Sequence, residues 1–187
     1  MFVVTGPSGA GKGTLIKRLL AEMPELELAV SATTREQRPG EQDGREYWFV
    51  SDEEFDRRIE AGELLEWVVF PWAQRSGTLR SEIARIADRG RTPVLELELE
   101  GALRVKRRVL GSVTIFVDAP IRELERRLRE RATESAGEIE DRLALARLQK
   151  EQADAFDHVV ENDDVDQAVA RLAEIVEREL VGTLRGT

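Results

Sequence analysis

The chain has 187 residues, of which 41% are hydrophobic and 35% are charged, so we expect one compact domain with a heavily charged surface. Cysteine is absent, which excludes disulfides, thiol chemistry and thiolate metal sites. The formal net charge of −9 argues against a nucleic-acid polymer as a partner, although a few local arginines can still bind a single nucleotide.

The first elements of the chain have the order of a phosphate-binding site. An apolar strand at residues 2–4 precedes a glycine-rich run, and an amphipathic helix follows from about Thr14 until Pro24 stops it. Glycine lets several backbone N–H groups turn toward one anion, while the helix start and Lys12 add positive charge. We therefore predict that a polyphosphate binds the loop residues Gly6, Pro7, Ser8, Gly9, Ala10, Gly11, Lys12, Gly13 and Thr14.

The loop departs from the usual pattern at one position that matters for a metal ion. Gly13 follows the lysine, where the pattern normally has a Ser or Thr whose hydroxyl touches magnesium. Thr14 lies one residue further along, so the loop by itself leaves the metal ligand open. The string Gly-Lys-Gly-Thr resembles the loop of adenylate kinases, in which the metal is held largely through phosphates and water.

Beyond this loop, strand and helix patterns alternate along the chain. Strands are predicted at residues 28–31, 47–50, 64–70, 94–99, 113–117 and 158–160. Helices are predicted from residue 51, at 79–90, 102–109, 120–131 and 138–156, and from residue 165. The alternation indicates an α/β fold whose mainly parallel sheet is flanked by helices. No apolar stretch approaches a membrane span and a core strand starts beside Met1, so we expect a cytoplasmic protein without a signal peptide.

Carboxylates alternate with leucines over residues 95–100, which is unusual because a buried parallel strand is normally apolar on both faces. A period of two would place Glu96, Glu98 and Glu100 on one face, at the carboxyl end of the strand and at the same edge as the phosphate loop. For Glu96 and Glu100, the solvent-exposed face of an edge strand explains the pattern as well as a role in the site does. Glu98 is the site residue that we predict, and it joins Thr14 as a candidate metal ligand, directly or through water.

Three segments together resemble the acceptor-site signature of guanylate kinases. They are Ser31-Ala32-Thr33-Thr34-Arg35, Arg38-Pro39-Gly40-Glu41 and Asp43-Gly44-Arg45-Glu46-Tyr47-Trp48-Phe49-Val50. The similarity continues in the same order through Leu64-Leu65-Glu66-Trp67, Ser76-Gly77-Thr78-Leu79 and Asn162-Asp163-Asp164.

The resemblance implies both a fold and a reaction. The fold is a P-loop NTPase core at residues 1–30 and 80–187, with a small β-rich GMP-binding region at about 31–79 and a helical lid at about 128–142. The reaction is transfer of the γ-phosphoryl group of ATP to GMP or dGMP with Mg²⁺, which gives ADP and GDP. The expected partners are therefore two small nucleotides, without a nucleic-acid polymer or a membrane.

The resemblance also assigns residues to the acceptor phosphate. It implies that Arg35, Arg38 and Tyr47 hold the phosphate of GMP. The two arginines are three residues apart, so both can converge on one dianion through charge-assisted hydrogen bonds. Ser31 and Thr78 match positions that add hydrogen bonds near the base and the phosphate.

Glu66 matches the residue that reads guanine in the family. A carboxylate can accept hydrogen bonds from both N1–H and the N2 amino group of guanine. Adenine offers an acceptor at N1 and has no such amino group, so a buried carboxylate would face an acceptor and lose its partners. Glu66 therefore predicts strong discrimination in favour of GMP.

The donor side is assigned to a lid and to one asparagine. Arg131 and Arg142 match the two lid arginines of the family, which would close over ATP and neutralise charge on the transferring group. Asn162 matches a position that contacts the adenine end. The other arginines of the helix at 120–131 are interpreted as a solvated face paired with Glu123, Glu125 and Glu130. They are Arg122, Arg126, Arg127 and Arg129.

Besides Gly13, three departures from the family pattern predict a slower enzyme or a shifted acceptor. Glu98 occupies a place where the family usually has Asp, Ala132 replaces a glycine after the first lid arginine, and Ser76 stands where a tyrosine is common. Two alternatives stay open, a P-loop kinase for a different small phosphorylated acceptor and a non-catalytic binding module. Lys12 with the lid arginines favours an enzyme, and Glu66 with Ser31 favours a guanine acceptor. Nothing in the sequence specifies an oligomeric state.

Overall fold

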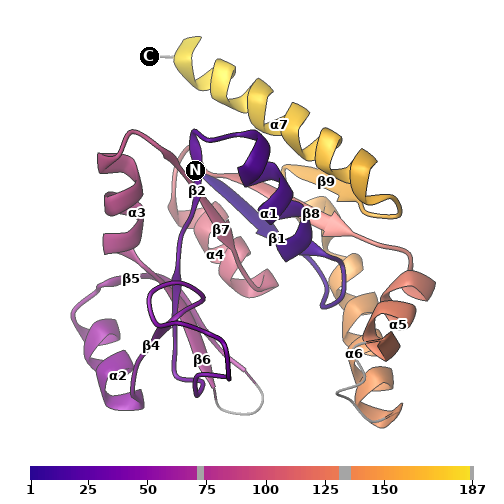
Figure 1. Ribbon diagram of the computed structural model, residues 1–187, viewed down its shortest axis with the longest axis horizontal. Coiled ribbons are helices and arrows are strands. Elements are labelled where there is room, and N and C mark those ends of the chain that lie inside the picture. The colour runs from indigo at the N-terminus through magenta and orange to yellow at the C-terminus, as the bar shows by residue number, and fades with distance from the viewer. Residues whose placement is uncertain (71–73, 131–135, 186–187) are drawn as a thin grey trace.

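The chain folds around two sheets, of which the larger carries the phosphate loop (Figure 1). The computed structural model describes residues 1–70, 74–130 and 136–185, so Arg131 and Ala132 lie outside the described residues. The larger sheet has the strand order β2-β7-β1-β8-β9, and each of its pairings is parallel. The strands are β1 (Phe2–Thr5), β2 (Leu26–Leu28), β7 (Thr92–Glu96), β8 (Val113–Asp118) and β9 (His158–Glu161). The predicted parallel α/β core is confirmed.

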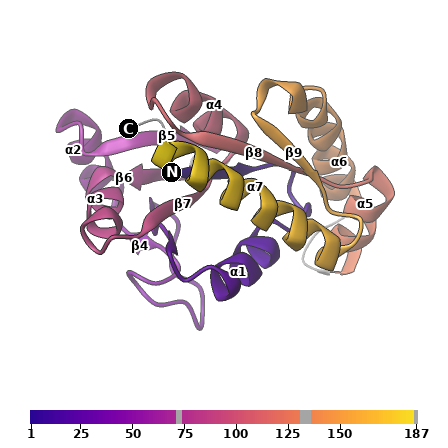
Figure 2. The same ribbon diagram turned by 90° about the horizontal axis from the view of Figure 1, so that it is seen from above.

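Helices cover both faces of the core sheet, which explains why the central strand β1 is buried throughout. Figure 2 shows α1 (Lys12–Glu22) and α7 (Val165–Arg185) on one side and α4 (Leu99–Arg108) on the other. One cluster of buried side chains lies between the sheet and α1 and α7, and a second lies beneath α4 and α3 (Arg80–Asp88). Every residue of β1 is buried between these two clusters, so the loop after β1 starts from a rigid support.

The smaller sheet holds three of the predicted acceptor residues, Ser31, Glu66 and Thr78. Its strand order is β4-β3-β6-β5, with one parallel and two antiparallel pairings. The strands are β3 (Ser31–Thr33), β4 (Trp48–Phe49), β5 (Leu64–Val69) and β6 (Arg75–Leu79). Helix α2 (Asp52–Glu60) covers this sheet through Phe55, and Ser51 caps it, because Ser51 Oγ accepts a hydrogen bond from Glu54 N at 3.1 Å.

A pair of helices packs beside the phosphate loop on the side away from the smaller sheet. They are α5 (Ile121–Glu130) and α6 (Ala136–Lys150), followed by a short 3₁₀ turn, η1 (Ala153–Ala155). Figure 1 shows this pair and the smaller sheet extending from the same end of the core, with the loop after β1 between them. No helix within the described ranges is both long enough and apolar enough to cross a membrane.

Near the acceptor region, one strand prediction was wrong in its boundaries and one strand was missed. The strand expected at 28–31 is split, because β2 ends at Leu28 in the core sheet and β3 begins at Ser31 in the smaller sheet. Strand β6 (Arg75–Leu79) was not predicted, since it contains little apolar sequence and pairs on both sides with β3 and β5. The helix expected at 138–156 ends at Lys150 before the short turn η1.

The strand expected at 94–99 also ends earlier than predicted. Strand β7 stops at Glu96. Glu98 directly precedes α4, and Glu100 lies in the first turn of that helix. The three carboxylates therefore do not share one strand face, and that expectation was wrong. Leu97 N still bonds to Val4 O at 3.0 Å, and the chain then enters α4 at Leu99.

Candidate active site

The glycines of the phosphate loop are required by contacts as well as by backbone angles. Gly6 has φ of 141°, and a Cβ there would lie 2.1 Å from Val117 O on the neighbouring strand. Gly11 has φ of 87°, and a Cβ there would lie 2.5 Å from Asn162 Nδ2. Any side chain at these positions would collide with atoms beneath the loop, so the tight curl depends on glycine.

The loop opens on a cavity of about 490 Å³ that has the polar lining expected for a polyphosphate. Lys12 Nζ reaches back to donate to Gly6 O at 2.7 Å and to Pro7 O at 3.2 Å, so its charge lies close to the loop backbone. Arg142 of α6 approaches from the other side, and its Nη1 donates to Ser8 Oγ at 3.1 Å. The lining residues are Ser8, Gly9, Gly11, Lys12, Gly13, Thr14, Lys17, Glu96 and Glu98.

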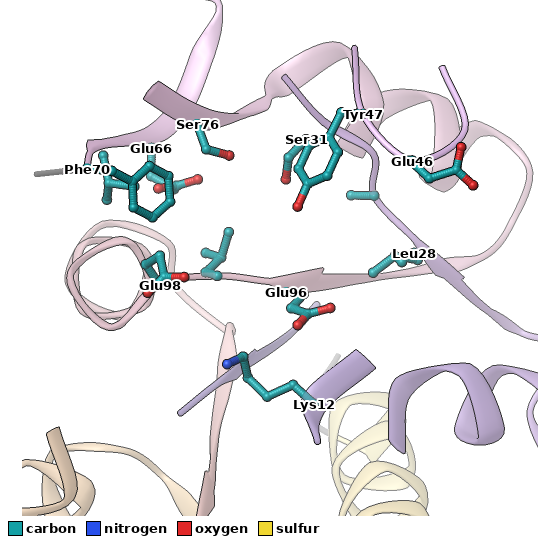
Figure 3. A pocket seen from close by; sticks show the side chains of 13 residues that line it. Lys12, Leu28, Ser31, Glu46, Tyr47, Glu66, Phe70, Ser76, Glu96 and Glu98 are labelled. Atoms are coloured by element: carbon teal, nitrogen blue, oxygen red, sulfur yellow. The ribbon is translucent and has the colours of Figure 1, made fainter. Parts of the chain in front are cut away.

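A second cavity, of about 160 Å³, adjoins the first and lies between the two sheets. Lys12, Glu96 and Glu98 line both cavities, so the two spaces meet at these side chains. Figure 3 shows Lys12 and Glu96 on one side of this second cavity and Glu66, Ser31 and Tyr47 on the opposite side. Its other lining residues are Leu28, Ala29, Glu46, Val68, Phe70, Ser76, Leu97 and Glu98.

Glu66 is held rigidly at the wall of the smaller cavity. The residue is only 4% exposed, and its Oε1 accepts from Thr78 N at 3.1 Å and from Thr78 Oγ1 at 2.8 Å. Its Oε2 lies beside Gly101 of α4, where a Cβ would come within 2.5 Å. Burial raises the pKa of Glu66, and the two Thr78 hydrogen bonds and the nearby Arg104 lower it again.

The acceptor arginines have different surroundings. Arg35 Nη2 pairs with Glu41 Oε1 at 2.8 Å, and the guanidinium lies 5.3 Å from the centre of the Tyr47 ring. Arg38 is exposed, and its backbone N donates to Glu41 Oε2 at 2.8 Å. Tyr47 lines the smaller cavity, and Arg35 supports it through this ring contact. The structure thus brings Arg35 next to the cavity lining, whereas Arg38 lies further out.

Glu96 is a residue whose place in the site the sequence left undecided. It lines both cavities, and desolvation raises the pKa of its carboxyl while Lys12 lowers it and Glu98 raises it. Its Oε2 would lie 3.7 Å from a Cβ at Gly13, so the carboxylate reaches toward the position that lacks a side chain hydroxyl. Carboxylate oxygens are suitable ligands for Mg²⁺.

Asn162 lies beneath the loop. It is only 1% exposed, its Nδ2 donates to Ala10 O at 2.6 Å, and its backbone N donates to Asp118 O at 2.7 Å. These contacts join the end of β8 to the loop backbone. The contact with adenine that the family resemblance implies for Asn162 remains a prediction.

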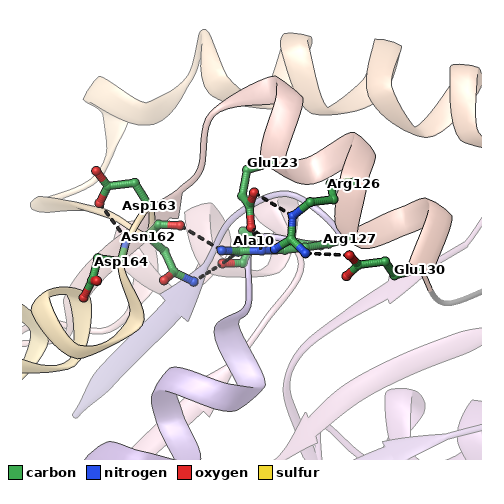
Figure 4. Close-up of polar contacts among 9 residues, drawn as sticks. Ala10, Glu123, Arg126, Arg127, Glu130, Asn162, Asp163 and Asp164 are labelled. Carbon is green, nitrogen blue, oxygen red and sulfur yellow. Dashed lines mark hydrogen bonds and ion pairs between the residues drawn. The ribbon is translucent and has the colours of Figure 1, made fainter.

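The interpretation of Arg127 as part of a solvated face was wrong. Its Nη1 donates to Gly9 O at 3.3 Å and to Ala10 O at 3.2 Å, and its Nη2 donates to Asn162 O at 3.1 Å (Figure 4). The side chain is 18% exposed, whereas that of its neighbour Arg126 is 55% exposed. One sequence signal could have found it, since position 127 is three residues after the buried Leu124 and borders the apolar stripe of α5.

Comparison with known proteins gives one consistent family. The family model described as guanylate kinase matches residues 1–179. The chain is 46% identical to a guanylate kinase of Synechococcus elongatus over 92% of this chain and 94% of that protein. It is 44% identical to one of Rubrobacter xylanophilus over 97% of this chain and 95% of that protein. A crystal structure of guanylate kinase from Anaplasma phagocytophilum matches with a TM-score of 0.76 at 28% identity, covering 96% of this chain and 85% of that one.

Proposed function

Because this chain belongs to the guanylate kinase family, we propose that it transfers the γ-phosphoryl group of ATP to GMP or dGMP and releases ADP together with GDP or dGDP. The phosphate loop and its cavity would bind ATP, and the smaller cavity between the sheets would bind the monophosphate. This arrangement also accounts for the negative net charge, since the substrates are small and are met by local cations.

The observation that carries the proposal is the position of Glu66. A carboxylate that is almost fully buried and fixed by Thr78 lies in the wall of a cavity that adjoins the phosphate loop. Burying a carboxylate without a charged partner in direct contact is costly, so such a group is retained where a ligand supplies its hydrogen bonds. The N1–H and N2 amino groups of guanine provide two parallel donors of this kind.

The acceptor phosphate is assigned to Arg35, Arg38 and Tyr47. Arg35 already rests against the Tyr47 ring, and its charge is balanced by Glu41. A phosphate dianion would compete with Glu41 for the guanidinium and would draw the exposed Arg38 toward the same oxygens. Ser31 faces the cavity and would add a hydroxyl contact to the bound nucleotide.

The reaction needs little acid–base chemistry from the protein. The second pKa of a phosphomonoester is about 6, so the attacking oxygen of GMP is already anionic at neutral pH. The main obstacle is the approach of two anions, which positive groups and backbone N–H donors can offset. We assign this role to Lys12, Arg142 and the loop N–H groups, with Arg131 as a further lid arginine outside the described residues.

Magnesium is the expected metal, and the residues at the boundary of the two cavities fit it. Glu96 and Glu98 present carboxylate oxygens near the loop, and Thr14 adds a hydroxyl to the lining. Glu96, which reaches toward Gly13, would hold the ion, and Glu98 and Thr14 would contribute directly or through water. When bound, the ion would neutralise charge on the phosphate oxygens.

A coupled assay of ADP release separates this activity from its alternatives. Purified protein would be supplied with ATP, Mg²⁺ and one of GMP, dGMP, AMP or no acceptor. We expect turnover with GMP far above that with AMP, and a basal rate without acceptor. Comparable rates with GMP and AMP would refute the assignment of Glu66, and the absence of any acceptor-dependent release would refute the enzyme. A cytoplasmic location remains a prediction that cell fractionation would test.

A further inference from the structure

Arg127 occupies an unusual position for an arginine on a surface helix. Its Nη1 and Nη2 donate to three backbone carbonyls, those of Gly9, Ala10 and Asn162, at 3.1–3.3 Å. Its Nε donates to Glu123 Oε1 at 2.8 Å, one turn earlier on α5. Figure 4 shows the guanidinium between Glu123 and the pair formed by Ala10 and Asn162. A helix at the side of the loop is therefore connected directly to the loop backbone.

The carbonyl of Ala10 receives the strongest restraint. It accepts one hydrogen bond from Arg127 Nη1 at 3.2 Å and another from Asn162 Nδ2 at 2.6 Å. Ala10 itself is completely buried, and its own N donates to Pro7 O at 3.1 Å within the loop. Two donors on one carbonyl fill both of its lone pairs, so the orientation of the peptide plane is fixed.

Fixing this carbonyl has a consequence on the other side of the same peptide. The chain has no cis peptide bonds among its described residues, so the C=O of Ala10 and the N–H of Gly11 point in opposite directions. With the carbonyl held against Arg127 and Asn162, the Gly11 N–H is turned away from them. Gly11 lines the larger cavity, which is where a polyphosphate would receive that N–H.

We propose that Arg127 is a positioning residue for the phosphate loop, which presets the loop N–H groups for a polyphosphate by holding the Gly9 and Ala10 carbonyls from outside. Donors that are already aimed at an anion bind it without a reorganisation cost. Loss of the contacts between Arg127 and the loop backbone therefore weakens phosphate binding. The inference rests on the proposed function, because it takes the larger cavity as the polyphosphate site.

Arginine suits this task better than lysine would. A planar guanidinium offers donors in several fixed directions, so one side chain reaches the carbonyls of Gly9, Ala10 and Asn162 together. An ammonium is a point charge on a flexible stem and could satisfy only part of this set. Arg127→Lys is therefore expected to keep the charge while losing most of the restraint.

The neighbouring arginine provides a matched control. Arg126 pairs with the same Glu123, at 2.5 Å, and with Glu130 at 2.6 Å on the outer face of α5. None of its contacts among the described residues reaches the loop. Arg126→Ala thus removes the same charge from the same helix without touching the loop carbonyls.

The test is calorimetric titration of inorganic tripolyphosphate, and separately of ATP, into the wild-type protein and the Arg127→Ala, Arg127→Lys and Arg126→Ala variants. Tripolyphosphate carries no nucleoside, so its affinity reports the polyphosphate site without any nucleoside contact. Each titration is made well below the unfolding temperature of the variant, so that a loss of stability by itself leaves the affinity unchanged. We expect Arg127→Ala and Arg127→Lys to weaken both ligands by about tenfold, with Arg126→Ala close to wild type.

Each outcome decides between the explanations. Wild-type affinity for tripolyphosphate in the Arg127 variants would overturn the inference and leave the proposed function intact, and a loss confined to ATP would do the same by indicating a nucleoside contact. An equal loss in Arg126→Ala would show a general charge effect and would also overturn it. No binding of tripolyphosphate or ATP by the wild-type protein would refute the polyphosphate site itself. If Arg127→Ala fails to fold, Arg127→Lys carries the comparison.

Discussion

Thr78 donates two hydrogen bonds to a single oxygen of Glu66, one from its backbone N at 3.1 Å and one from its Oγ1 at 2.8 Å. The two residues lie on the adjacent strands β6 and β5 and are register partners. Sheet pairing thus sets the position of the carboxylate, and the hydroxyl sets its rotation. The second oxygen, Oε2, lies on the side of α4 beside Gly101. A side chain at position 101 would displace it.

Replacing Glu66 by Gln should reduce discrimination between guanine and adenine. The amide has nearly the same shape and can still accept from Thr78, but only one of its two ends accepts a hydrogen bond from guanine. We expect kcat/KM for GMP to fall by about a hundredfold and the rate with AMP to change much less. The measurement is the ADP-release assay with both acceptors, with the exposed Glu60→Gln as a control. An unchanged ratio of GMP to AMP would contradict the assignment.

Replacing Thr78 by Val should show how much the rotation of Glu66 matters. Valine keeps the shape of threonine and removes the Oγ1 donor, while the bond from the backbone N remains. We expect KM for GMP to rise by about tenfold and the free energy of unfolding to fall by about 1 kcal/mol. Steady-state kinetics and urea denaturation would measure these two effects. A loss of stability with unchanged KM would mean that the hydroxyl serves the fold alone.

Glu66 also predicts a dependence of stability on pH. Burial raises the pKa of its carboxyl in the folded protein above the ordinary value of 4.5. Between these two pKa values the folded state binds more protons than the unfolded state, so the free energy of unfolding falls as pH rises. The contribution of Glu66 is therefore fully present below the ordinary pKa and is lost as pH rises through the folded pKa.

Urea denaturation from pH 4 to pH 8 would test this dependence. Glu66→Gln removes the titrating group, so the stability of the wild type relative to this variant should be greatest at low pH and should decline toward neutral pH. Glu60→Gln should follow the wild type across the range. A relative stability that increases with pH would show that the folded pKa lies below the ordinary value, in contradiction to the burial argument.

Residues whose role comes from a local motif could be predicted from the sequence. Lys12 follows from the loop pattern, and Glu66 and Tyr47 follow from short segments that resemble one family. The structure brings all three to the lining of one cavity. Their positions in the chain are far apart, but the loop with Lys12 follows β1 at the carboxyl edge of the parallel sheet, where ligands of such sheets bind, so this motif already indicates the region of the site.

Residues whose role comes from a tertiary contact were missed. Arg127 lies among charged residues that can all form i, i+4 pairs, and its place beside the apolar stripe of α5 shows only that it can turn inward, not that its guanidinium reaches a loop 117 residues earlier. The prediction that Glu96, Glu98 and Glu100 share one strand face was wrong for a related reason. Their alternation fits a strand by period, but the packing of α4 on the sheet ends the strand at Glu96. The local sequence pattern predicted whether a segment is a helix or a strand, whereas the residue at which each segment ends depends on long-range contacts.

The carboxylate beside Gly13 leads to the last prediction, on the metal. Glu96 Oε2 reaches toward the position where other phosphate loops have a hydroxyl, and it lines both cavities. Glu96→Gln keeps the shape and removes the negative charge, so the Mg²⁺ concentration that gives half-maximal turnover should rise by about tenfold. Glu100→Gln is the matched control, because Glu100 lies nearby in the first turn of α4 and is highly exposed. Turnover would be measured against Mg²⁺ at saturating ATP and GMP. If both variants shift the curve equally, the effect is one of general charge; if neither does, the metal is held without Glu96.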